Sequence, residues 1–172
     1  MTFILASILL VSGCASPSKS VNMVPKNLNI KNQYPYSVNV EVGGGSKTNP
    51  LWTSQISDQA FREAITNSLT QSGIFSKVIN GSNADYLLEV IITNCNQPIV
   101  GFDMTVSMVT HWELTNLKTN KEIWEDFISS SYTATVGDAF AGIKRLRLAN
   151  EGAARENIKE GISTLSSLDE VL

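Results

Sequence analysis

The sequence has few of the residues from which catalytic centres are built. Its 172 residues include one histidine, His111, and two cysteines, Cys14 and Cys95. A zinc site or a histidine-based acid–base pair needs partners at set spacings, and His111 has no such companion in the sequence. The carboxylates are scattered, and Asp138, the most notable of them, is explained by a helix cap. We therefore expect no catalytic residue, no metal and no cofactor.

Charge of one sign is not concentrated either. The chain has 13 Lys and Arg residues against 16 Asp and Glu residues, so its formal net charge is −3. Without a block of like charge, neither a nucleic-acid footprint nor a polybasic membrane patch is supported. Three cations, Lys144, Arg145 and Arg147, gather near the start of the last predicted helix, which is the unfavourable end of the helix dipole. They are either a solvated face or a docking patch for an acidic or phosphate-bearing partner.

An apolar segment near the N-terminus is too short to cross a membrane. Phe3 to Val11 covers about nine residues, whereas a transmembrane helix needs about 20. It has the length of a signal-peptide core, and the small residues Ser12 and Gly13 stand directly before Cys14. Met1-Thr2 carries no Lys or Arg, which is the one departure from a signal peptide. The pattern predicts a secreted chain.

Val11-Ser12-Gly13-Cys14 resembles the lipobox of bacterial lipoproteins. The resemblance implies that signal peptidase II cuts after Gly13 and that Cys14 carries the lipid anchor, with three acyl chains. Ala15 rather than aspartate follows the cysteine, which implies the outer membrane of a Gram-negative cell. One acyl chain binds a membrane only marginally, so three chains would make the attachment effectively permanent.

Cys95 has no partner within the chain if Cys14 is acylated through its sulfur. A fold held by disulfides is thereby excluded. Because Cys95 lies in an apolar strand pattern, we expect a buried and inert thiol in an oxidising periplasm. The alternative is an intermolecular disulfide.

Composition divides the chain into three parts. Residues 1–13 are the predicted signal peptide, residues 14–36 the lipidated cysteine and a flexible tether, and residues 37–172 one domain of ordinary size. The tether is rich in Ser, Asn, Lys and Pro and has no clear hydrophobic period. A flexible chain of about 20 residues reaches about 25 Å, so the domain is expected to stand off the membrane.

Two hydrophobic periods alternate along the domain. Alternating apolar residues predict strands, and apolar residues three and four apart predict helices. Their order predicts an α+β domain, with a mostly antiparallel sheet of four or five strands and two helices on one face. A bulge is expected in the last strand, because its apolar residues change face. The expected strands are 37–42, 74–79, 84–95, 102–114 and 122–135, and the expected helices run from Thr53 or Ser54 to Gly73 and onward from a start between Asp138 and Leu146.

The strand at 84–95 has apolar residues on both faces. Leu88 and Val90 point one way, whereas Leu87 and Ile91 point the other way. Such a strand is either central or covered on its outer face by another element or a partner. Leu87 and Ile91 are therefore predicted partner-docking residues.

Four stretches together resemble small, mostly uncharacterised envelope lipoproteins of bacteria. The layout is also similar to the periplasmic domains of curli-secretion lipoproteins and of auxiliary lipoproteins that serve lipid transporters, which is an analogy at the level of fold. The sequence shows no membrane-inserting hairpins of the curli channel kind. The four stretches are Ala60-Phe61-Arg62, residues 84–89, Asp138-Ala139-Phe140 and residues 145–158.

The anchor, the tether and the partly apolar outer face predict a non-enzymatic lipoprotein of the outer membrane. It would bind protein partners in an envelope assembly, secretion or transport system, and further copies of the chain are one class of partner. The alternative is an auxiliary of a lipid transporter that holds a lipid or small apolar ligand internally. An enzyme would need a cleft that gathers His111, Asp138 and a serine. The internal ligand pocket would be lined by Phe61, Met104, Met108 and Trp112.

Overall fold

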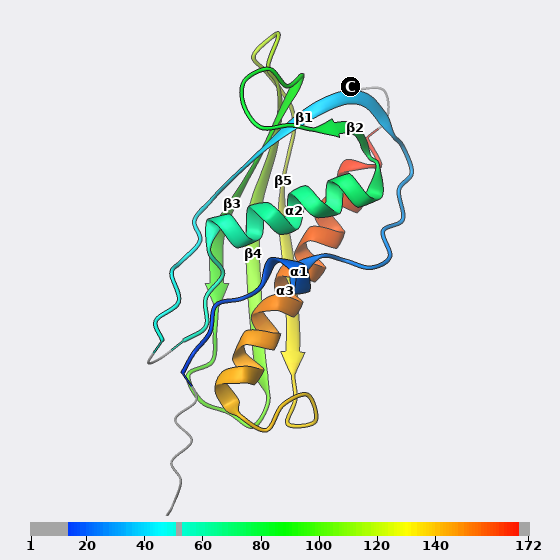
Figure 1. The fold of residues 1–172 in the computed structure, drawn as a ribbon. Coiled ribbons are helices and arrows are strands. Elements are labelled where there is room, and N and C mark those ends of the chain that lie inside the picture. The colour runs from blue at the N-terminus through cyan, green and yellow to red at the C-terminus, as the bar shows by residue number, and fades with distance from the viewer. Residues whose placement is uncertain (1–13, 51–52, 169–172) are drawn as a thin grey trace, which may run out of the picture.

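The computed structural model describes residues 14–50 and 53–168, and the predicted signal peptide lies outside these residues. Five strands form one mixed sheet in the order β2-β1-β3-β4-β5, and the two long helices cover one face of it (Figure 1). The predicted α+β class, with two helices on one face, is confirmed. The elements are α1 (Ser20–Met23), β1 (Tyr34–Gly43), α2 (Asp58–Ser72), β2 (Phe75–Val78), β3 (Tyr86–Asn96), β4 (Met104–Asn116), β5 (Lys121–Ala134) and α3 (Gly142–Leu165).

The parallel half of the sheet is built around β1. This strand pairs with β2 on one side and with β3 on the other, in parallel with both. Helix α2 makes the connection from β1 to β2. Val38 and Val40 are buried beneath the helices, as their alternation predicts. The strand begins earlier than expected because Tyr34 already donates its N–H to the carbonyl oxygen of Ile74 at 2.7 Å.

The antiparallel half consists of β3, β4 and β5, and it contains the expected bulge. Leu114 pairs with Trp124, whereas Thr115 pairs with Glu122, so Ile123 is the extra residue of β5. An extra residue moves the side chains that follow it to the opposite face. This explains why the apolar pattern of β5 wavers in the sequence.

Helix α2 begins later than predicted. Its N-cap is Ser57, whose hydroxyl accepts a hydrogen bond from the N–H three residues on at 3.2 Å. The expected caps Thr53 and Ser54 are wrong, because this segment is extended and the carbonyl oxygen of Ser54 is taken by the Asn150 amide at 2.8 Å. The helix ends as predicted at Gly73, whose φ of 65° suits glycine.

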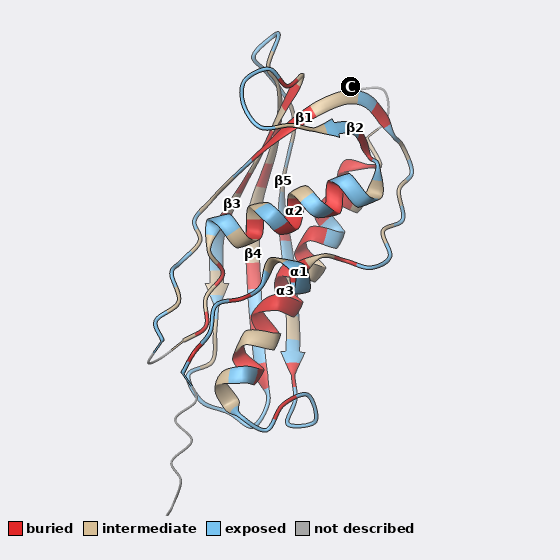
Figure 2. Cartoon of the chain, in the orientation of Figure 1, coloured by how far each residue is buried: buried red, intermediate tan, exposed pale blue. Residues whose placement is uncertain are grey.

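Helix α3 begins at Gly142, within the predicted interval, and its glycines let it lie close to the sheet. A Cβ added at Gly161 would lie 2.6 Å from the ring of Trp112. One added at Gly152 would overlap the ring of Tyr132. The side of α3 that faces the sheet is accordingly buried along most of its length (Figure 2).

The predicted tether, residues 14–36, is not a free chain in the structure. It runs over the helices, and the fully buried Met23 of α1 belongs to the hydrophobic core. The N–H of Lys19 and the side-chain amide of Asn22 each donate to the carboxylate of Glu151 on α3 at 2.9 Å. The prediction of a flexible tether is therefore corrected. Its polar composition hid a segment whose few apolar and backbone groups find partners only in the folded domain.

Asp85 joins three segments at one end of the sheet. Its carboxylate accepts a hydrogen bond from Lys118 Nζ in the β4–β5 hairpin at 2.7 Å. It also accepts from the N–H and the hydroxyl of Ser37 on β1, at 2.9 and 2.7 Å. The Lys118 ammonium and then these Ser37 donors hold the pKa of Asp85 well below its usual range.

Asp85→Asn is expected to lower the free energy of unfolding at pH 7. Because the folded-state pKa is lowered, the stabilisation is complete above the unfolded-state pKa of about 3.9 and is lost as pH falls from there towards the folded-state pKa. Urea denaturation should give the same difference in free energy of unfolding between parent and variant at pH 7 and pH 5, and a smaller difference at pH 3. Asp103→Asn, in an exposed loop, is the matched control. A difference that is unchanged at pH 3 would contradict this role of Asp85.

Candidate functional site

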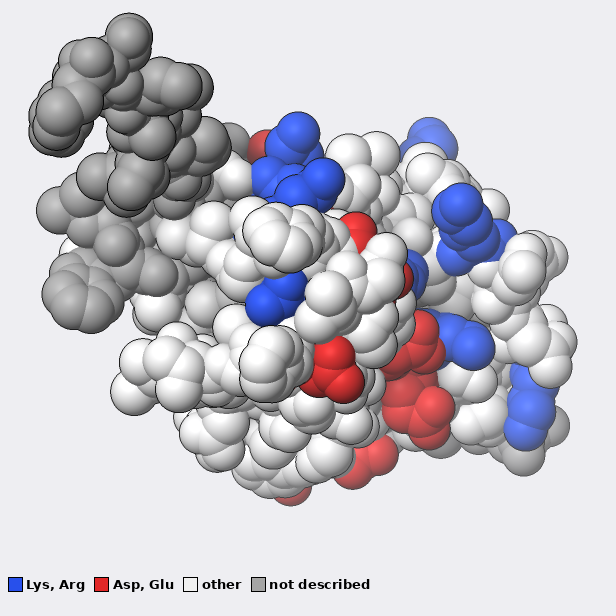
Figure 3. Space-filling view, turned by 90° about the horizontal axis from the view of Figure 1, so that it is seen from below, with Lys and Arg blue, Asp and Glu red and all other residues white. Residues whose placement is uncertain are grey.

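The predicted lipid-attachment residue, Cys14, is exposed at one end of the domain. The residues after it are held in place: the Ala15 N–H donates to the Pro50 carbonyl oxygen at 2.8 Å, and the Ser16 hydroxyl accepts from Arg147 Nη1 at 2.6 Å. Figure 3 looks onto this end of the molecule. A lipid on Cys14 would therefore join the chain directly at the surface of the domain.

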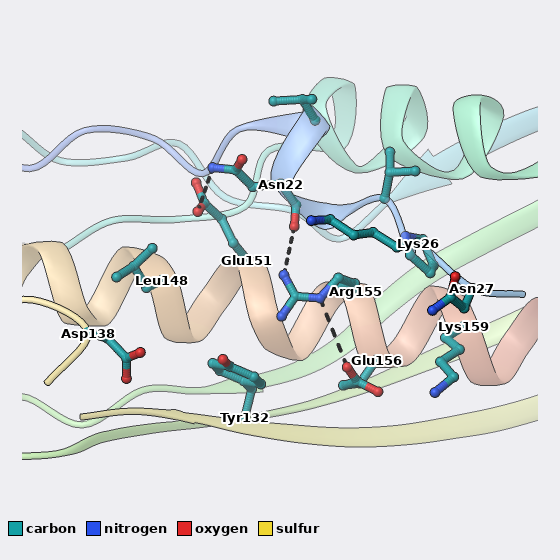
Figure 4. Close-up of a pocket in the computed structure, with 13 residues that line it drawn as sticks. Asn22, Lys26, Asn27, Tyr132, Asp138, Leu148, Glu151, Arg155, Glu156 and Lys159 are labelled. Carbon is teal, nitrogen blue, oxygen red and sulfur yellow. Dashed lines mark hydrogen bonds and ion pairs between the residues drawn. The ribbon is translucent and has the colours of Figure 1, made fainter. Parts of the chain in front are cut away.

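A groove of about 620 Å³ runs between the N-terminal segment, α3 and β5 (Figure 4). At its centre the guanidinium of Arg155 lies 5.3 Å from the centre of the Tyr132 ring and donates to the Asn22 carbonyl oxygen at 3.0 Å. Arg155 Nε also lies 4.0 Å from the carboxylate of Glu156. The arginine thus bridges both walls of the groove. The other cations that line the groove are Lys26 and Lys159.

Glu151 forms part of the same groove and is the more deeply buried acid, with 2 % of its surface exposed. Besides Lys19 and Asn22, its carboxylate faces Arg147 Nε at 3.6 Å. A buried carboxylate is tolerated only with such donors and a counter-charge. The acids and bases of the groove are therefore matched largely within the chain, and their effect is to hold the N-terminal segment on α3.

The three cations predicted as one docking patch are separated by the fold. Lys144 is exposed. Arg147 is engaged by Ser16 and Glu151, as described above. Arg145 is buried, with 7 % of its surface exposed, and is not available for docking.

Arg145 instead connects two loops. Its Nη1 donates to the carbonyl oxygens of Ala139 and Phe140 at 2.7 and 2.6 Å, and its Nη2 donates to that of Gly101 at 3.4 Å. The first two acceptors belong to the loop before α3 and the third to the loop before β4. The first turn of α3 directs the guanidinium back onto these loops, which is why the sequence cluster does not form one surface.

The face of the sheet opposite the helices is uncovered among the described residues. The predicted docking residues Leu87 and Ile91 lie on it and are half-buried. On β5, Phe127 is 62 % exposed, and its ring centre lies 4.7 Å from that of His111. His111 Nε2 is 3.2 Å from a carboxylate oxygen of Glu125. The face therefore mixes apolar rings and branched chains with charged groups.

A row of glutamates crosses this face, and sequence reasoning missed it. Glu41 pairs with Glu89, Glu89 with Glu113, and Glu113 with Glu125. Adjacent strands lie about 4.8 Å apart, and like charges directly opposite each other are destabilising. Strand alternation places Glu89 and Glu113 outward, but only the register of four strands brings the carboxylates into one row. The uncovered face is therefore acidic.

The fold does not bring His111 and Asp138 together. His111 lies on the uncovered face, whereas Asp138 lies in the turn between β5 and α3. The Asp138 carboxylate accepts from the N–H and hydroxyl of Thr135 at 2.7 and 2.9 Å, and these bonds lower the pKa of Asp138. Asp138 therefore closes a turn and does not cap α3. These two residues form no part of a common cleft.

The described residues contain few other groups that could react or bind a ligand. Cys95 is half-buried on the inner face, and burial raises the pKa of its thiol, which lowers the reactivity of that thiol. Within residues 14–50 and 53–168, no group of three or more His, Cys, Asp or Glu side chains is placed to hold a metal ion. In the same ranges, no helix is both long and apolar enough to cross a membrane.

No protein-family model matches the sequence, and no curated protein sequence matches it. Solved structures do match the fold. A protein of Xanthomonas campestris from the family DUF330 aligns with a TM-score of 0.62 and 10% identity, over 83% of this chain and 89% of that chain. PelC from Paraburkholderia phytofirmans, solved as a dodecamer, aligns with a TM-score of 0.53 and 15% identity, over 83% and 96%.

A candidate lipoprotein from Caulobacter crescentus is also similar. It aligns with a TM-score of 0.51 and 18% identity, over 74% of this chain and 88% of that chain. Identities this low establish the fold alone. The chain has the fold found in small bacterial lipoproteins.

Proposed function

We propose that this chain is an envelope lipoprotein, held on the outer membrane by Cys14, whose domain binds protein partners through the uncovered sheet face. The observation that carries the proposal is this face, where Leu87, Ile91 and Phe127 lie beside the glutamate row. Exposed apolar residues rimmed by charge are typical of protein interfaces. The first partner we assign is a further copy of the same chain.

Charge complementarity supports self-association. The uncovered face is acidic. The groove on the opposite side of the domain has as many acids as bases among its lining residues, but its lysines, Lys26 and Lys159, are exposed and belong to none of the ion pairs found among the described residues. Two different surfaces that fit each other make a head-to-tail contact, which closes into a ring when the rotation between copies allows it. PelC, whose fold this chain shares, was solved as a dodecamer.

A photo-crosslinking amino acid at Leu87 or Ile91 tests the proposed interface in intact cells. We expect crosslinks from these positions to a second copy of the chain, identified by mass spectrometry. The same amino acid at Thr70, which is exposed on α2, is the control and should give none. Crosslinks to other proteins alone would keep partner binding and reject self-association. The absence of specific products from both positions would reject the interface.

Cys14→Ser is expected to move the protein from the membrane to the soluble periplasmic fraction, because the acyl chains supply the attachment. Cys95→Ser is the matched control and should leave the protein on the membrane, since Cys95 is half-buried and follows no lipobox in the sequence. Fractionation on a density gradient, with the protein detected by antibody, measures the location of both variants, and incorporation of radiolabelled palmitate reports their acylation. Membrane attachment that survives Cys14→Ser would contradict the proposed anchor.

The alternative function, a lipid held inside the domain, requires space among Phe61, Met104, Met108 and Trp112. These side chains are 0 to 6 % exposed and belong to one continuous core. None of them lines the groove between α1, α3 and β5. The packing of these residues favours a structural role, so the surface proposal is preferred.

A further inference from the structure

Exposed apolar side chains gather at the end of the domain that carries Cys14. Among the described residues, five of the seven exposed large hydrophobic side chains belong to two loops, 97–103 and 135–141. Phe102 is 87 % exposed and Phe140 is 93 % exposed. Single exposed apolar residues are ordinary, but a group on adjacent loops indicates a surface that meets an apolar partner. The five residues are Ile99, Val100, Phe102, Val136 and Phe140.

The two loops are neighbours and are linked to each other. Met104, the first residue of β4, pairs with Ala134, the last residue of β5, so loop 97–103 and loop 135–141 leave the sheet side by side. The buried Arg145 donates to carbonyl oxygens of both loops. Their apolar tips are therefore presented together from a fixed base.

Cys14 lies at the same end because the residues after it are docked. Arg147, in the second turn of α3, binds Ser16, and Ala15 binds Pro50. The start of the described chain and both loops lie at the lower end in Figure 1. Figure 3, which looks onto this end, shows a broad area without charged side chains, with most of the charged ones gathered to one side. A lipid on Cys14 leaves no free tether between the membrane and this surface.

We infer that loops 97–103 and 135–141 insert their apolar side chains into the surface of the membrane to which Cys14 is attached. This inference rests on the proposed lipid anchor. Apolar and aromatic side chains are stabilised at the boundary of headgroups and acyl chains. The exposed Lys144 at this end suits anionic headgroups. Asp103 and Asp138, also exposed here, offset that attraction, so the apolar contact dominates.

The contact fixes the orientation of the domain. The end of the sheet at which β4 begins faces the membrane, and the β4–β5 hairpin at the other end of the sheet faces away from it. The uncovered acidic face is then roughly perpendicular to the membrane surface, and partners attached to the same membrane can reach it from the side. A free tether of the predicted length would have allowed any orientation.

The test uses the mature lipidated chain in vesicles of phosphatidylethanolamine and phosphatidylglycerol. An environment-sensitive fluorophore is placed on Phe102→Cys or Phe140→Cys in a Cys95→Ala background, where the acylated Cys14 does not react. Thr119→Cys, in the hairpin at the opposite end, is the control. We expect a several-fold rise in intensity and a shift to shorter wavelength at positions 102 and 140, and water-like emission at position 119.

The possible results separate loop insertion from the lipid anchor. Water-like emission at all three positions, in chain that remains on the vesicles, would overturn loop insertion and leave the anchor intact. Chain that does not remain on the vesicles would overturn the anchor and, with it, this inference. In a second variant, Phe102→Ser with Phe140→Ser, a fluorophore on Val100→Cys should lose most of its enhanced intensity. All three side chains are exposed, so the fold is retained, and unchanged intensity would count against the inference.

Discussion

Trp112→Ala is expected to lower the free energy of unfolding by about 3–5 kcal/mol, the largest effect of any substitution considered. The indole is fully buried, and its ring lies against α3 where Gly161 leaves room for it. Its N–H donates to the Thr110 hydroxyl at 2.8 Å, and that hydroxyl donates to the Asn157 side chain at 2.7 Å. The substitution therefore leaves both a cavity and a broken buried network. Urea denaturation followed by circular dichroism measures the loss.

A double-mutant cycle with Gly161→Ala separates the steric effect from general damage. With Trp112 present, the added methyl group meets the ring, and overpacking of about 1–3 kcal/mol is expected to exceed the gain of about 1 kcal/mol in helix propensity. With Trp112→Ala, the same methyl group enters the vacated space and should stabilise the domain. Gly142→Ala, where a Cβ makes only ordinary contacts, is the control. Equal effects of Gly161→Ala in both backgrounds would refute the close packing of Trp112 on α3.

Glu151→Ala is expected to release the N-terminal segment from α3. Removing one partner of a buried charge pair costs about 3–5 kcal/mol, and we expect the lower end because Arg147 retains some exposure. A local cost of about 3 kcal/mol corresponds to an increase of about a hundredfold in amide exchange over residues 15–24. Hydrogen exchange with peptide-level mass spectrometry reads this directly. The increase should be confined to that segment and the groove.

The control for Glu151 is Lys19→Ala. Lys19 contributes only its backbone N–H to the carboxylate, so removing its side chain should leave exchange over residues 15–24 almost unchanged. Exchange that rises equally in both variants would show that the segment is held by something other than Glu151. Release of the segment would also restore a flexible connection to the anchor, with a reach of about 25 Å. Loop insertion should then weaken in the vesicle experiment.

Much of the fold could be predicted from local pattern. Strand-like sequence patterns located all five strands and placed Leu88 and Leu87 on opposite faces, and helical spacing located both long helices. Gly73 was predicted as the end of α2 because few other residues adopt a positive φ without strain. The bulge at Ile123 left its mark as a change of face in the apolar pattern. Each of these features depends on residues that are close together in the sequence, within one or two helical turns or a few strand residues.

The candidate surfaces were predicted only in part. Leu87 and Ile91 were assigned correctly to the outer face, because a period of two determines the side of a sheet. The glutamate row was missed, because its members come from four strands and meet only through register. Arg145 was grouped with Lys144 and Arg147 by adjacency, yet burial of its guanidinium depends on where two distant loops lie.

The sequence by itself determined the fold class, the faces of the strands with regular alternation and, through the lipobox resemblance, the anchor proposed at Cys14. Only the tertiary structure decided that residues 15–33 dock on the helices and that the apolar loops share an end with Cys14. The physical reason is that strand and helix periods are local, whereas docking joins groups as far apart as Lys19 and Glu151, 132 positions along the chain. Such contacts depend on the packing of the whole domain, and no short sequence pattern predicts them.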